Sequence, residues 1–395
     1  MPPPVPSSAT RFLVAGLSAG LAALAAVALV HRAKDAPPPA PPGVPSWLCA
    51  LLAERAAAGP LAPLPEAERP RREPIPLETA ARFVHQLKWP DHEYDPVLLY
   101  RWSGNVERAF AQPEHAGGGF IVRTNARGMR SPEPAAESPD LRVLCAGDSQ
   151  TEGYCENAET FPALLAERLG QAHPGRSVEV LNAGCGGYSF YHHLATLDRH
   201  GDLAPRVFLQ VVFAGNDFGE SLTLRHFYER LPPPGDLDTD PETAQRLKEV
   251  GGSFLNQGLL QADLFRRQPE ERAVALAAAR ETAAAIGRAC AERGMRYVAV
   301  YLPPLWDAQP GVHARALDEA RALLGLAEED LARAGGLGAA WREAARAAGA
   351  EVVDLTGALA ASTEPLFYAA DHHLNARGAA VVADALFPVL ERELR

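Results

Sequence analysis

The sequence predicts an α/β fold in which a parallel sheet carries helices on both faces. Two observations predict it. Short apolar runs rich in Val, Leu and Ile are typical of buried strands, and stretches with a helical pattern alternate with them along residues 140–395. Such alternation indicates a parallel sheet, because a parallel neighbour needs a crossover connection, which is usually a helix. The expected strands cover residues 141–146, 178–181, 207–213, 296–302 and 350–355.

The expected helices begin and end at residues that favour those positions. Pro162 lies in a first helical turn and Gly170 follows that helix, while Gly294 follows an Ala-rich stretch. Asn375 is a suitable N-cap for the last helix. The expected helices cover residues 160–169, 270–293, 314–334, 338–348 and 376–393.

Three further regions surround this core. Residues 36–84 form a Pro-rich spacer with a short amphipathic helix expected over 47–58. Residues 85–139 hold aromatic strand-like runs, which predicts a small β-rich accessory layer covering an edge of the main sheet. Residues 221–268 interrupt the alternation of strands and helices in the 140–395 domain. Long insertions of this kind are commonly lids or substrate walls, so we expect this one to set specificity.

Four short polar blocks lie where strands end or the last helix begins. The carboxyl ends of parallel strands border the ligand crevice of an open α/β sheet, so these blocks should converge there. A serine nucleophile needs an adjacent base, which a distant histidine could supply. Taken alone, each block occurs at least as often in ordinary turns as in active sites. The blocks are Gly147-Asp148-Ser149, Asn182-Ala183-Gly184, Gly215-Asn216-Asp217 and Asp371-His372-His373.

In this order and at these spacings the blocks resemble those of the GDSL esterases, also called SGNH hydrolases. The resemblance implies a three-layer α/β/α sandwich with a flavodoxin-like parallel sheet. It also implies that Ser149 is the nucleophile, His373 the base and Asp371 the residue that orients the imidazole. The backbone N–H groups of Ser149 and Gly184 and the side-chain amide of Asn216 would form the oxyanion hole.

The C-terminal block departs from the commonest family pattern, which has an Asp three residues before the His. That position is Ala370 here, and Asp371 stands two residues before His373. The neighbouring His372 is an alternative base. We favour His373, because the helix start at Asn375 gives it the distance from the sheet that the resemblance requires.

The resemblance implies acyl-ester hydrolysis through a Ser149 acyl-enzyme, without a metal or organic cofactor. By analogy with anchored members, the substrate would be a small acyl ester of carbohydrate or envelope material. Two alternatives stay open. The same residues could make an O-acyltransferase if a sugar hydroxyl replaces water, or the chain could be a non-catalytic polysaccharide-binding or assembly protein.

Residues 1–35 are expected to be a membrane anchor or a signal sequence. The stretch from Phe12 to Val30 is uncharged and apolar, and roughly 20 such residues cross a bilayer. Cleavage near Ala23-Leu24-Ala25 would instead release a secreted protein. We favour a single-pass anchor, because the apolar run continues past that position. The Pro-rich spacer and the resemblance to anchored members favour a domain outside the cytoplasm, although Arg32 and Lys34 favour the opposite orientation.

Composition limits the partners. The net charge of −11 argues against nucleic acid, which basic surfaces bind. His192 and His193 lack further ligands at metal spacing and are interpreted as structural. Among the five cysteines, Cys155 and Cys185 each follow a polar block and are either a disulfide pair or two buried thiols. The sequence does not indicate an oligomeric state.

Overall fold

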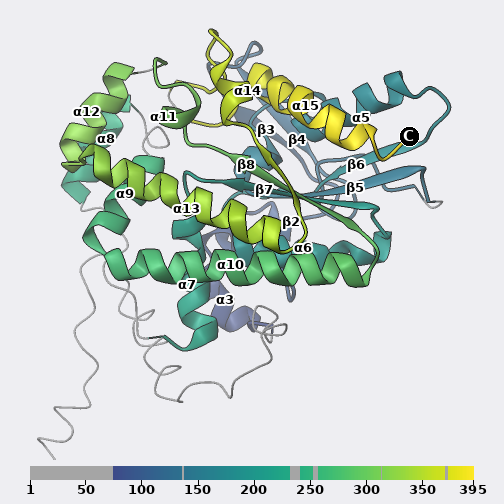
Figure 1. Ribbon diagram of the computed structural model, residues 1–395, viewed down its shortest axis with the longest axis horizontal. Coiled ribbons are helices and arrows are strands. Elements are labelled where there is room, and N and C mark those ends of the chain that lie inside the picture. Colours follow the sequence, from purple (N-terminus) through teal and green to yellow (C-terminus); the bar gives the residue numbers. More distant parts are fainter. Residues whose placement is uncertain (1–73, 136–137, 232–240, 252–256, 313, 370–371) are drawn as a thin grey trace, which may run out of the picture.

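The computed structural model describes residues 74–135, 138–231, 241–251, 257–312, 314–369 and 372–395. Its centre is a parallel sheet between two layers of helices (Figure 1). The expected helix over 47–58 and Asp371 lie outside the described residues. Within the described part, no helix combines the length and hydropathy of a membrane span, and the apolar stretch from Phe12 to Val30 lies outside that part.

The five-stranded sheet has the order β6-β5-β7-β8-β9, and every neighbouring pair is parallel. The chain runs outward from β5 to β6 and then crosses back to β7. The carboxyl ends of β5 and β7 therefore border the switch point where α/β sheets bind ligands. The prediction of these strands is confirmed to within one or two residues. They are β5 (Leu141–Ala146), β6 (Val178–Asn182), β7 (Val207–Phe213), β8 (Arg296–Leu302) and β9 (Glu351–Asp354).

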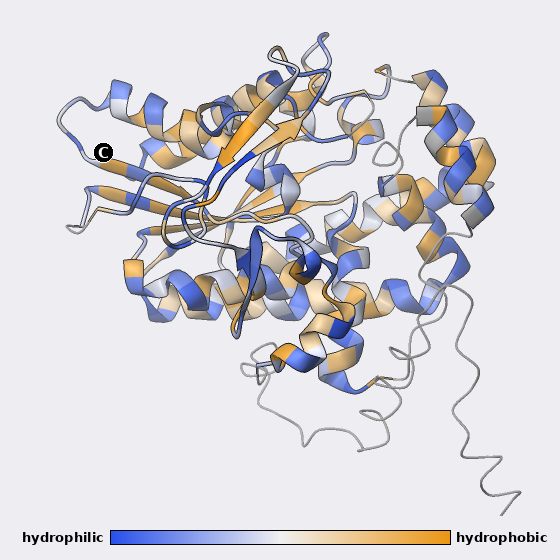
Figure 2. Cartoon of the chain, turned by 180° about the vertical axis from the view of Figure 1, so that it is seen from behind, coloured by the Kyte–Doolittle hydropathy of each residue, from blue (hydrophilic) through white to orange (hydrophobic). Residues whose placement is uncertain are grey.

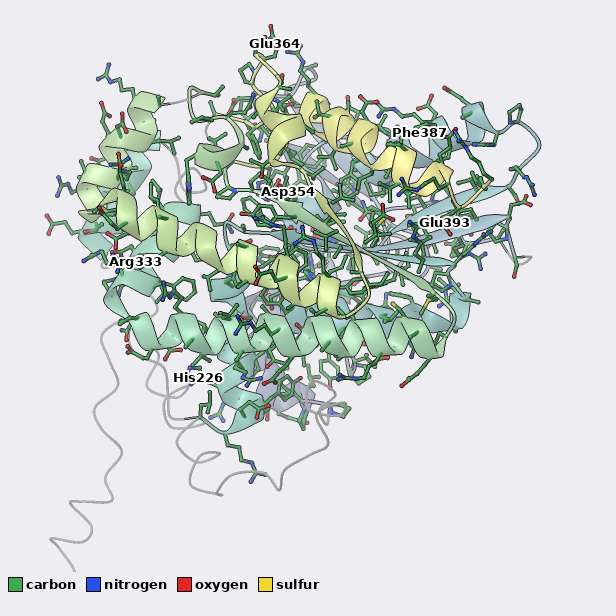
Figure 3. The ribbon with its side chains drawn as sticks, viewed as in Figure 1. His226, Arg333, Asp354, Glu364, Phe387 and Glu393 are labelled. Carbon is green, nitrogen blue, oxygen red and sulfur yellow. The ribbon has the colours of Figure 1, made fainter. Side chains whose placement is uncertain are left out.

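Each face of the sheet has its own hydrophobic core. Leu209, Val211 and Phe213 of β7 point to one face, and Phe208 and Val212 point to the other, as the two-residue period of a strand requires. Figure 2 shows the apolar strands between helices with one apolar and one polar side, and Figure 3 shows side chains filling both layers. The first face carries α5 (Phe161–Ala172), α14 (Thr356–Ala360) and α15 (Ala376–Glu391); the second carries α6 (Phe190–His200), α7 (Asp217–Glu229), α10 (Pro269–Glu292) and α13 (Glu328–Ala347).

The helices differ from the prediction at three places. Helix α5 continues through Gly170 to Ala172. The expected helix over 314–334 ends early, because Gly325 has φ +63° and separates α12 (Ala314–Leu324) from α13. Helix α13 then runs through the expected second break. Gly338 packs in its interior, where a Cβ would lie 2.4 Å from the ring of Tyr301.

The accessory region contains two antiparallel hairpins. The hairpin over residues 92–102 packs against α6, where Asp95 pairs with Arg199, and the hairpin over residues 107–123 hydrogen-bonds to Glu156 and Asn157. The segment after them runs along the edge strand β6, where the Arg130 N–H donates to the Asn182 carbonyl oxygen at 3.0 Å. This segment, which is not a strand, lies along the sheet edge where a β-rich layer was expected, whereas the hairpins reach over the carboxyl ends of the strands. The elements are α3 (Leu77–Phe83), η1 (His85–Lys88), β1 (His92–Asp95), β2 (Leu99–Trp102), β3 (Glu107–Ala111) and β4 (Gly119–Arg123).

The insertion over 221–268 is mainly helical where it is described. Its first part completes α7, and α8 (Pro241–Gly251) and α9 (Gln257–Arg267) pack against α12 and α13. These two helices therefore extend the helical layer. The remaining short elements are α4 (Ser149–Glu152), η2 (Asn157–Glu159), η3 (Gly201–Leu203) and α11 (Leu305–Ala308).

Candidate active site

Ser149 stands at the tip of β5 on a tight turn. The turn needs glycine at position 147, where a Cβ would lie 2.1 Å from Thr151 Oγ1. Asp148 caps the next helix by accepting the Gln150 N–H at 2.9 Å, so Ser149 becomes the first residue of α4. The Nε2 atom of His373 lies 2.8 Å from the Ser149 hydroxyl oxygen. The structure thus brings His373 to the serine, within the reach of a general base.

The side chain of Gln150 holds the histidine loop. Its Nε2 donates to the His372 carbonyl oxygen at 3.0 Å, and its Oε1 accepts the Leu374 N–H at 2.9 Å. One buried amide therefore hydrogen-bonds to the backbone on both sides of His373. Because Gln150 directly follows the nucleophile, it couples the positions of the two reacting groups. Sequence analysis missed this residue, since nothing in the motif distinguishes it from a solvent-exposed helix residue.

Tyr154 was also missed by sequence analysis. Its ring stacks on the His373 imidazole, with centroids 3.8 Å apart and an angle of 3° between the planes. The Tyr154 carbonyl oxygen accepts the Tyr368 hydroxyl at 3.0 Å, which ties the two loops together. The stacked ring restricts rotation of the imidazole, and its π face favours a positive charge on it. Asp371 lies outside the described residues, so its role as the residue that orients His373 stays a prediction.

The expected backbone donor at Gly184 is occupied. Its N–H donates to the Asn182 side-chain oxygen at 3.1 Å, and a Cβ on it would lie 2.6 Å from the Glu152 nitrogen. Gly184 therefore packs behind α4. The serine faces the following turn, where the Gly186 carbonyl oxygen accepts the Tyr100 hydroxyl at 2.9 Å. Since a trans peptide directs its C=O and N–H to opposite sides, the Gly187 N–H points away from Tyr100, and it has no partner among the described residues.

Asn216 follows β7 beside a group of buried carboxyls. Its Nδ2 donates to Glu220 Oε1 at 3.0 Å. Burial raises the pKa of Asp148 to about 6 and the pKa of Glu220 to about 8. Burial, with Asp148 and Glu220 nearby, also raises the pKa of Asp217 well above its usual range. Glu220 is therefore mostly neutral at pH 7, whereas Asp148 is mostly ionised there.

A cavity of about 260 Å³ opens onto Ser149, and most of its wall comes from the accessory hairpins. The rings of Phe110 and Phe120 stack with centroids 5.5 Å apart, and the Arg108 guanidinium, ion-paired with Asp91, lies over the Phe110 ring. Within the described part of 221–268, no residue lines this cavity, and the accessory region supplies most of its wall. The prediction that this insertion sets specificity stays a prediction, because residues 232–240 and 252–256 lie outside the described residues. The lining residues are Trp89, Trp102, Arg108, Phe110, Phe120, Val122, Ser149, Glu152, Tyr154 and Gly186.

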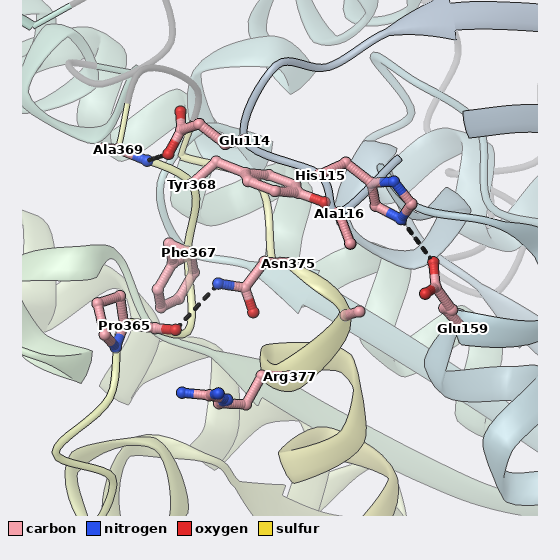
Figure 4. Close-up of a pocket in the computed structure, with 11 residues that line it drawn as sticks. Glu114, His115, Ala116, Glu159, Pro365, Phe367, Tyr368, Ala369, Asn375 and Arg377 are labelled. Carbon is pink, nitrogen blue, oxygen red and sulfur yellow. Dashed lines mark hydrogen bonds and ion pairs between the residues drawn. The ribbon is translucent and has the colours of Figure 1, made fainter. Parts of the chain in front are cut away.

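A shallower cavity of about 550 Å³ lies behind the histidine loop (Figure 4). The turn between β3 and β4 forms one wall, where Glu114 accepts the Ala369 N–H at 2.7 Å. The neighbouring His115 contacts Glu159 at 2.8 Å, which fixes this turn to the η2 segment. The accessory region therefore contacts both the substrate cavity and the chain segment that precedes His373.

The cysteines of the site are buried thiols. Cys155 and Cys185 are both free, so the alternative of a disulfide between them is not present in the structure. Cys185 Sγ lies 3.7 Å from His92 Nε2, and burial raises the pKa of the Cys155 thiol to about 12. Neither thiol is therefore a nucleophile at neutral pH.

Comparison with protein families agrees with this geometry. The GDSL-like lipase/acylhydrolase family matches residues 145–323, which include Ser149 and Asn216. The SGNH hydrolase-like domain of the acetyltransferase AlgX matches residues 256–395, which include His373. Residues 145–395 form a GDSL-type SGNH hydrolase domain. The protein is accordingly a hydrolase or an acyl-transfer enzyme.

Several solved structures resemble this domain at low identity. The α/β hydrolase LAE5 from the metagenome of Lake Arreo is 16% identical, with 66% of this chain and 98% of that chain covered and a TM-score of 0.38. A lipase/acylhydrolase from Enterococcus faecalis is 14% identical, with coverage of 65% and 97% and a TM-score of 0.37. An acetyl xylan esterase from Geobacillus stearothermophilus is 12% identical, with 64% of this chain and 94% of that chain covered and a TM-score of 0.34. A comparison with curated proteins found no match.

Proposed function

We propose that this SGNH domain cleaves small acyl esters through an acyl-enzyme on Ser149. The contact of 2.8 Å between His373 Nε2 and the Ser149 oxygen carries the proposal. His373 takes the hydroxyl proton as Ser149 attacks the ester carbonyl, and it returns that proton to the leaving alkoxide. A water molecule, activated in the same way, then releases the acid and restores the serine.

The oxyanion would be held by the Ser149 N–H, the Asn216 amide and one glycine N–H. For the last donor we propose Gly187 in place of Gly184, because the Gly184 N–H is already used by Asn182 and the Gly187 N–H is free of described partners. Donors that are fixed before the reaction stabilise charge that appears only in the transition state.

The cavity beside Ser149 supports a proposal for the substrate class. Ligand pockets for drug-sized molecules measure roughly 300–1,000 Å³, so a cavity of about 260 Å³ suits one small group. Aromatic rings bind the apolar face of a sugar ring or a short acyl chain, and Glu152 and Arg108 offer polar contacts at the same wall. We therefore propose acyl esters of carbohydrate, with short acyl groups, as substrates.

Replacing Ser149 by Ala tests the proposal. We expect turnover of p-nitrophenyl acetate to fall by at least about 10³-fold, because the residual rate would come only from binding and the oxyanion donors. Labelling by a fluorophosphonate should modify Ser149 in the native protein and nothing in the variant. An exposed serine, Ser138→Ala, is the matched control. Undiminished turnover by the Ser149 variant would refute the proposal.

Acyl transfer to a sugar hydroxyl is the second candidate, and one observation favours it. The segment that supplies His373 matches the SGNH domain of the acetyltransferase AlgX. Transfer needs the same acyl-enzyme, with an acceptor hydroxyl in the place of water. Product analysis by mass spectrometry, with p-nitrophenyl acetate as donor and an unacetylated oligosaccharide as acceptor, distinguishes an acetylated oligosaccharide from free acetate.

The position of the domain relative to a membrane also remains a proposal. We infer that the apolar stretch from Phe12 to Val30 anchors the protein and that the domain lies outside the cytoplasm. Fusion of alkaline phosphatase to the C-terminus reports this directly, because that enzyme is active only outside the cytoplasm. An inactive fusion that is nonetheless present in the membrane fraction would reverse the orientation.

A further inference from the structure

Asn216 and Glu220 form an incompletely bonded pair at the start of α7. They are four residues apart and so share one side of the helix, where Asn216 Nδ2 donates to Glu220 Oε1 at 3.0 Å. The other two polar atoms of the pair are Asn216 Oδ1 and Glu220 Oε2. Both are shielded from solvent, and neither has a partner within the described part of the chain.

Two acceptor oxygens satisfy each other only if one of them carries a proton. A proton on Glu220 Oε2 turns that oxygen into a donor for Asn216 Oδ1. The neutral acid and the amide would then share two hydrogen bonds, a pairing that fixes the plane of the amide. An ionised Glu220 accepts only, so Asn216 Oδ1 would stay buried without a donor.

The surroundings of Glu220 favour the neutral acid. The titratable groups that face it are Asp148 before α4, Asp217 on its own helix, Tyr100 on β2 and His192 on α6. Burial lowers the pKa of His192 to about 3 and holds the pKa of Tyr100 well above its usual range, so both are neutral near pH 7. Burial, followed by the Asp148 charge, raises the pKa of Glu220 to about 8.

We propose that neutral Glu220 is a positioning residue for the oxyanion hole, which holds the Asn216 amide so that its second N–H faces the substrate oxygen. The inference rests on the proposed function. One N–H of Asn216 is directed at Glu220, and the Asn216 amide lies beside Asp148, the neighbour of Ser149. The second N–H, which Glu220 does not engage, is the one available to the substrate oxygen.

Ionisation of Glu220 should slow catalysis for two reasons. The amide loses the donor that fixes its plane, and a negative charge appears next to the forming oxyanion. Both effects act on the transition state, so kcat should fall while KM changes little. Neutral His373 alone gives a rate that levels off at high pH, because the base is already unprotonated there. An alkaline decline is thus the signature of Glu220.

The test compares pH profiles of p-nitrophenyl acetate hydrolysis from pH 6 to 10, with the Ser149→Ala protein as the correction for base hydrolysis. In the native protein, kcat should fall roughly tenfold per pH unit above about 8. Glu220→Gln keeps an amide that donates at every pH, so its kcat should be lower but flat. Glu249→Gln, an exposed carboxylate on α8, is the control and should follow the native profile.

Each outcome decides the inference. A flat native profile, or a Glu220→Gln profile that declines like the native one, overturns it. Should Glu220→Gln fail to fold, Glu220→Met replaces it. This variant lacks the donor, so we expect kcat at pH 7 to be at least tenfold lower, with no alkaline decline. Fluorophosphonate labelling keeps the two proposals apart, because a native protein that neither turns over nor labels at Ser149 disproves the function rather than the role of Glu220.

Discussion

At the scale of single residues, the site depends on how one imidazole is held. His373 meets Ser149 across 224 positions of sequence, and its loop lies next to residues 370–371, which are outside the described part. Two described contacts position it: the Gln150 amide on the flanking backbone and the Tyr154 ring on the imidazole face. Displacement of a reacting group by about 1 Å can cost 10²-fold in rate. These contacts should therefore matter for kcat.

Gln150→Ala tests the two hydrogen bonds that Gln150 makes to the backbone beside His373. We expect kcat/KM for p-nitrophenyl acetate to fall by roughly 10- to 100-fold, because the histidine loop loses both hydrogen bonds that hold it against the nucleophile. Gln150→Glu keeps the acceptor for the Leu374 N–H and removes the donor to the His372 carbonyl. Its kcat/KM should therefore lie between those of the native protein and Gln150→Ala. The control is Gln171→Ala, an exposed glutamine on α5. Equal kcat/KM values for Gln150→Ala and the control would show that these two hydrogen bonds are dispensable.

The residues of the site were predicted unevenly from sequence. Ser149, His373 and Asn216 stand beside strand ends or a helix cap, so the periodic pattern around them gave their positions. Gly184 was expected to donate to the substrate, yet its N–H bonds to Asn182. That difference comes from the course of the turn over residues 184–187, which depends on tertiary contacts such as the Tyr100 hydroxyl. No local pattern records such a contact.

At the scale of elements, the accessory hairpins have more than a covering role. They supply most of the wall of the cavity at Ser149, although their sequence shows only short aromatic runs. The insertion over 221–268 had the length and position typical of a lid, but its described helices pack against α12 and α13. Length and position in the chain do not tell which side of the sheet an insertion reaches, because that depends on its partners.

Phe110→Ala should alter the choice of substrate. The ring lines the cavity and stacks on Phe120, so its removal enlarges the space beside Ser149. One methylene in an apolar pocket changes specificity by roughly 10- to 200-fold. We expect the ratio of kcat/KM for p-nitrophenyl butyrate over acetate to rise about tenfold or more. The control is Val97→Ala, an exposed accessory residue, and an unchanged ratio in both proteins would show that the acyl group binds elsewhere.

Glycines explain where helix boundaries were and were not predictable. Gly325 ends α12 because its φ of +63° is a conformation that glycine adopts readily. Gly170 and Gly338 lie inside helices, and Gly338 is required by the neighbouring Tyr301 ring. The same residue type therefore marks a helix end at one position and close packing at another. Only the packing partner, which is remote in sequence, separates the two cases.

At the scale of the whole molecule, the titration of buried groups determines how the free energy of unfolding depends on pH. Burial lowers the pKa of His92 and His200 to about 4 and of His192 and His193 to about 3. These histidines fold in their neutral form, so between their lowered pKa values and about 6.5 the unfolded chain binds more protons. Stability therefore rises with pH in that window and gains nothing more from them above 6.5.

Glu220 changes the stability in the opposite direction to the histidines, and its effect reaches to higher pH. Its pKa is raised from 4.5 to about 8, so the folded protein binds the extra proton, and stability falls as the pH rises through that interval. Between pH 6.5 and 8 the buried histidines are already neutral, and Asp217, whose pKa burial also raises, can only add to the fall. At 1.36 kcal/mol per pH unit, Glu220 alone should lower the free energy of unfolding by about 2 kcal/mol over this range. Urea denaturation at pH 5 to 9 measures the fall, and Glu220→Gln should make it smaller by about 2 kcal/mol. A native protein whose stability keeps rising from pH 6.5 to 8 would show that Glu220 is already ionised in the fold.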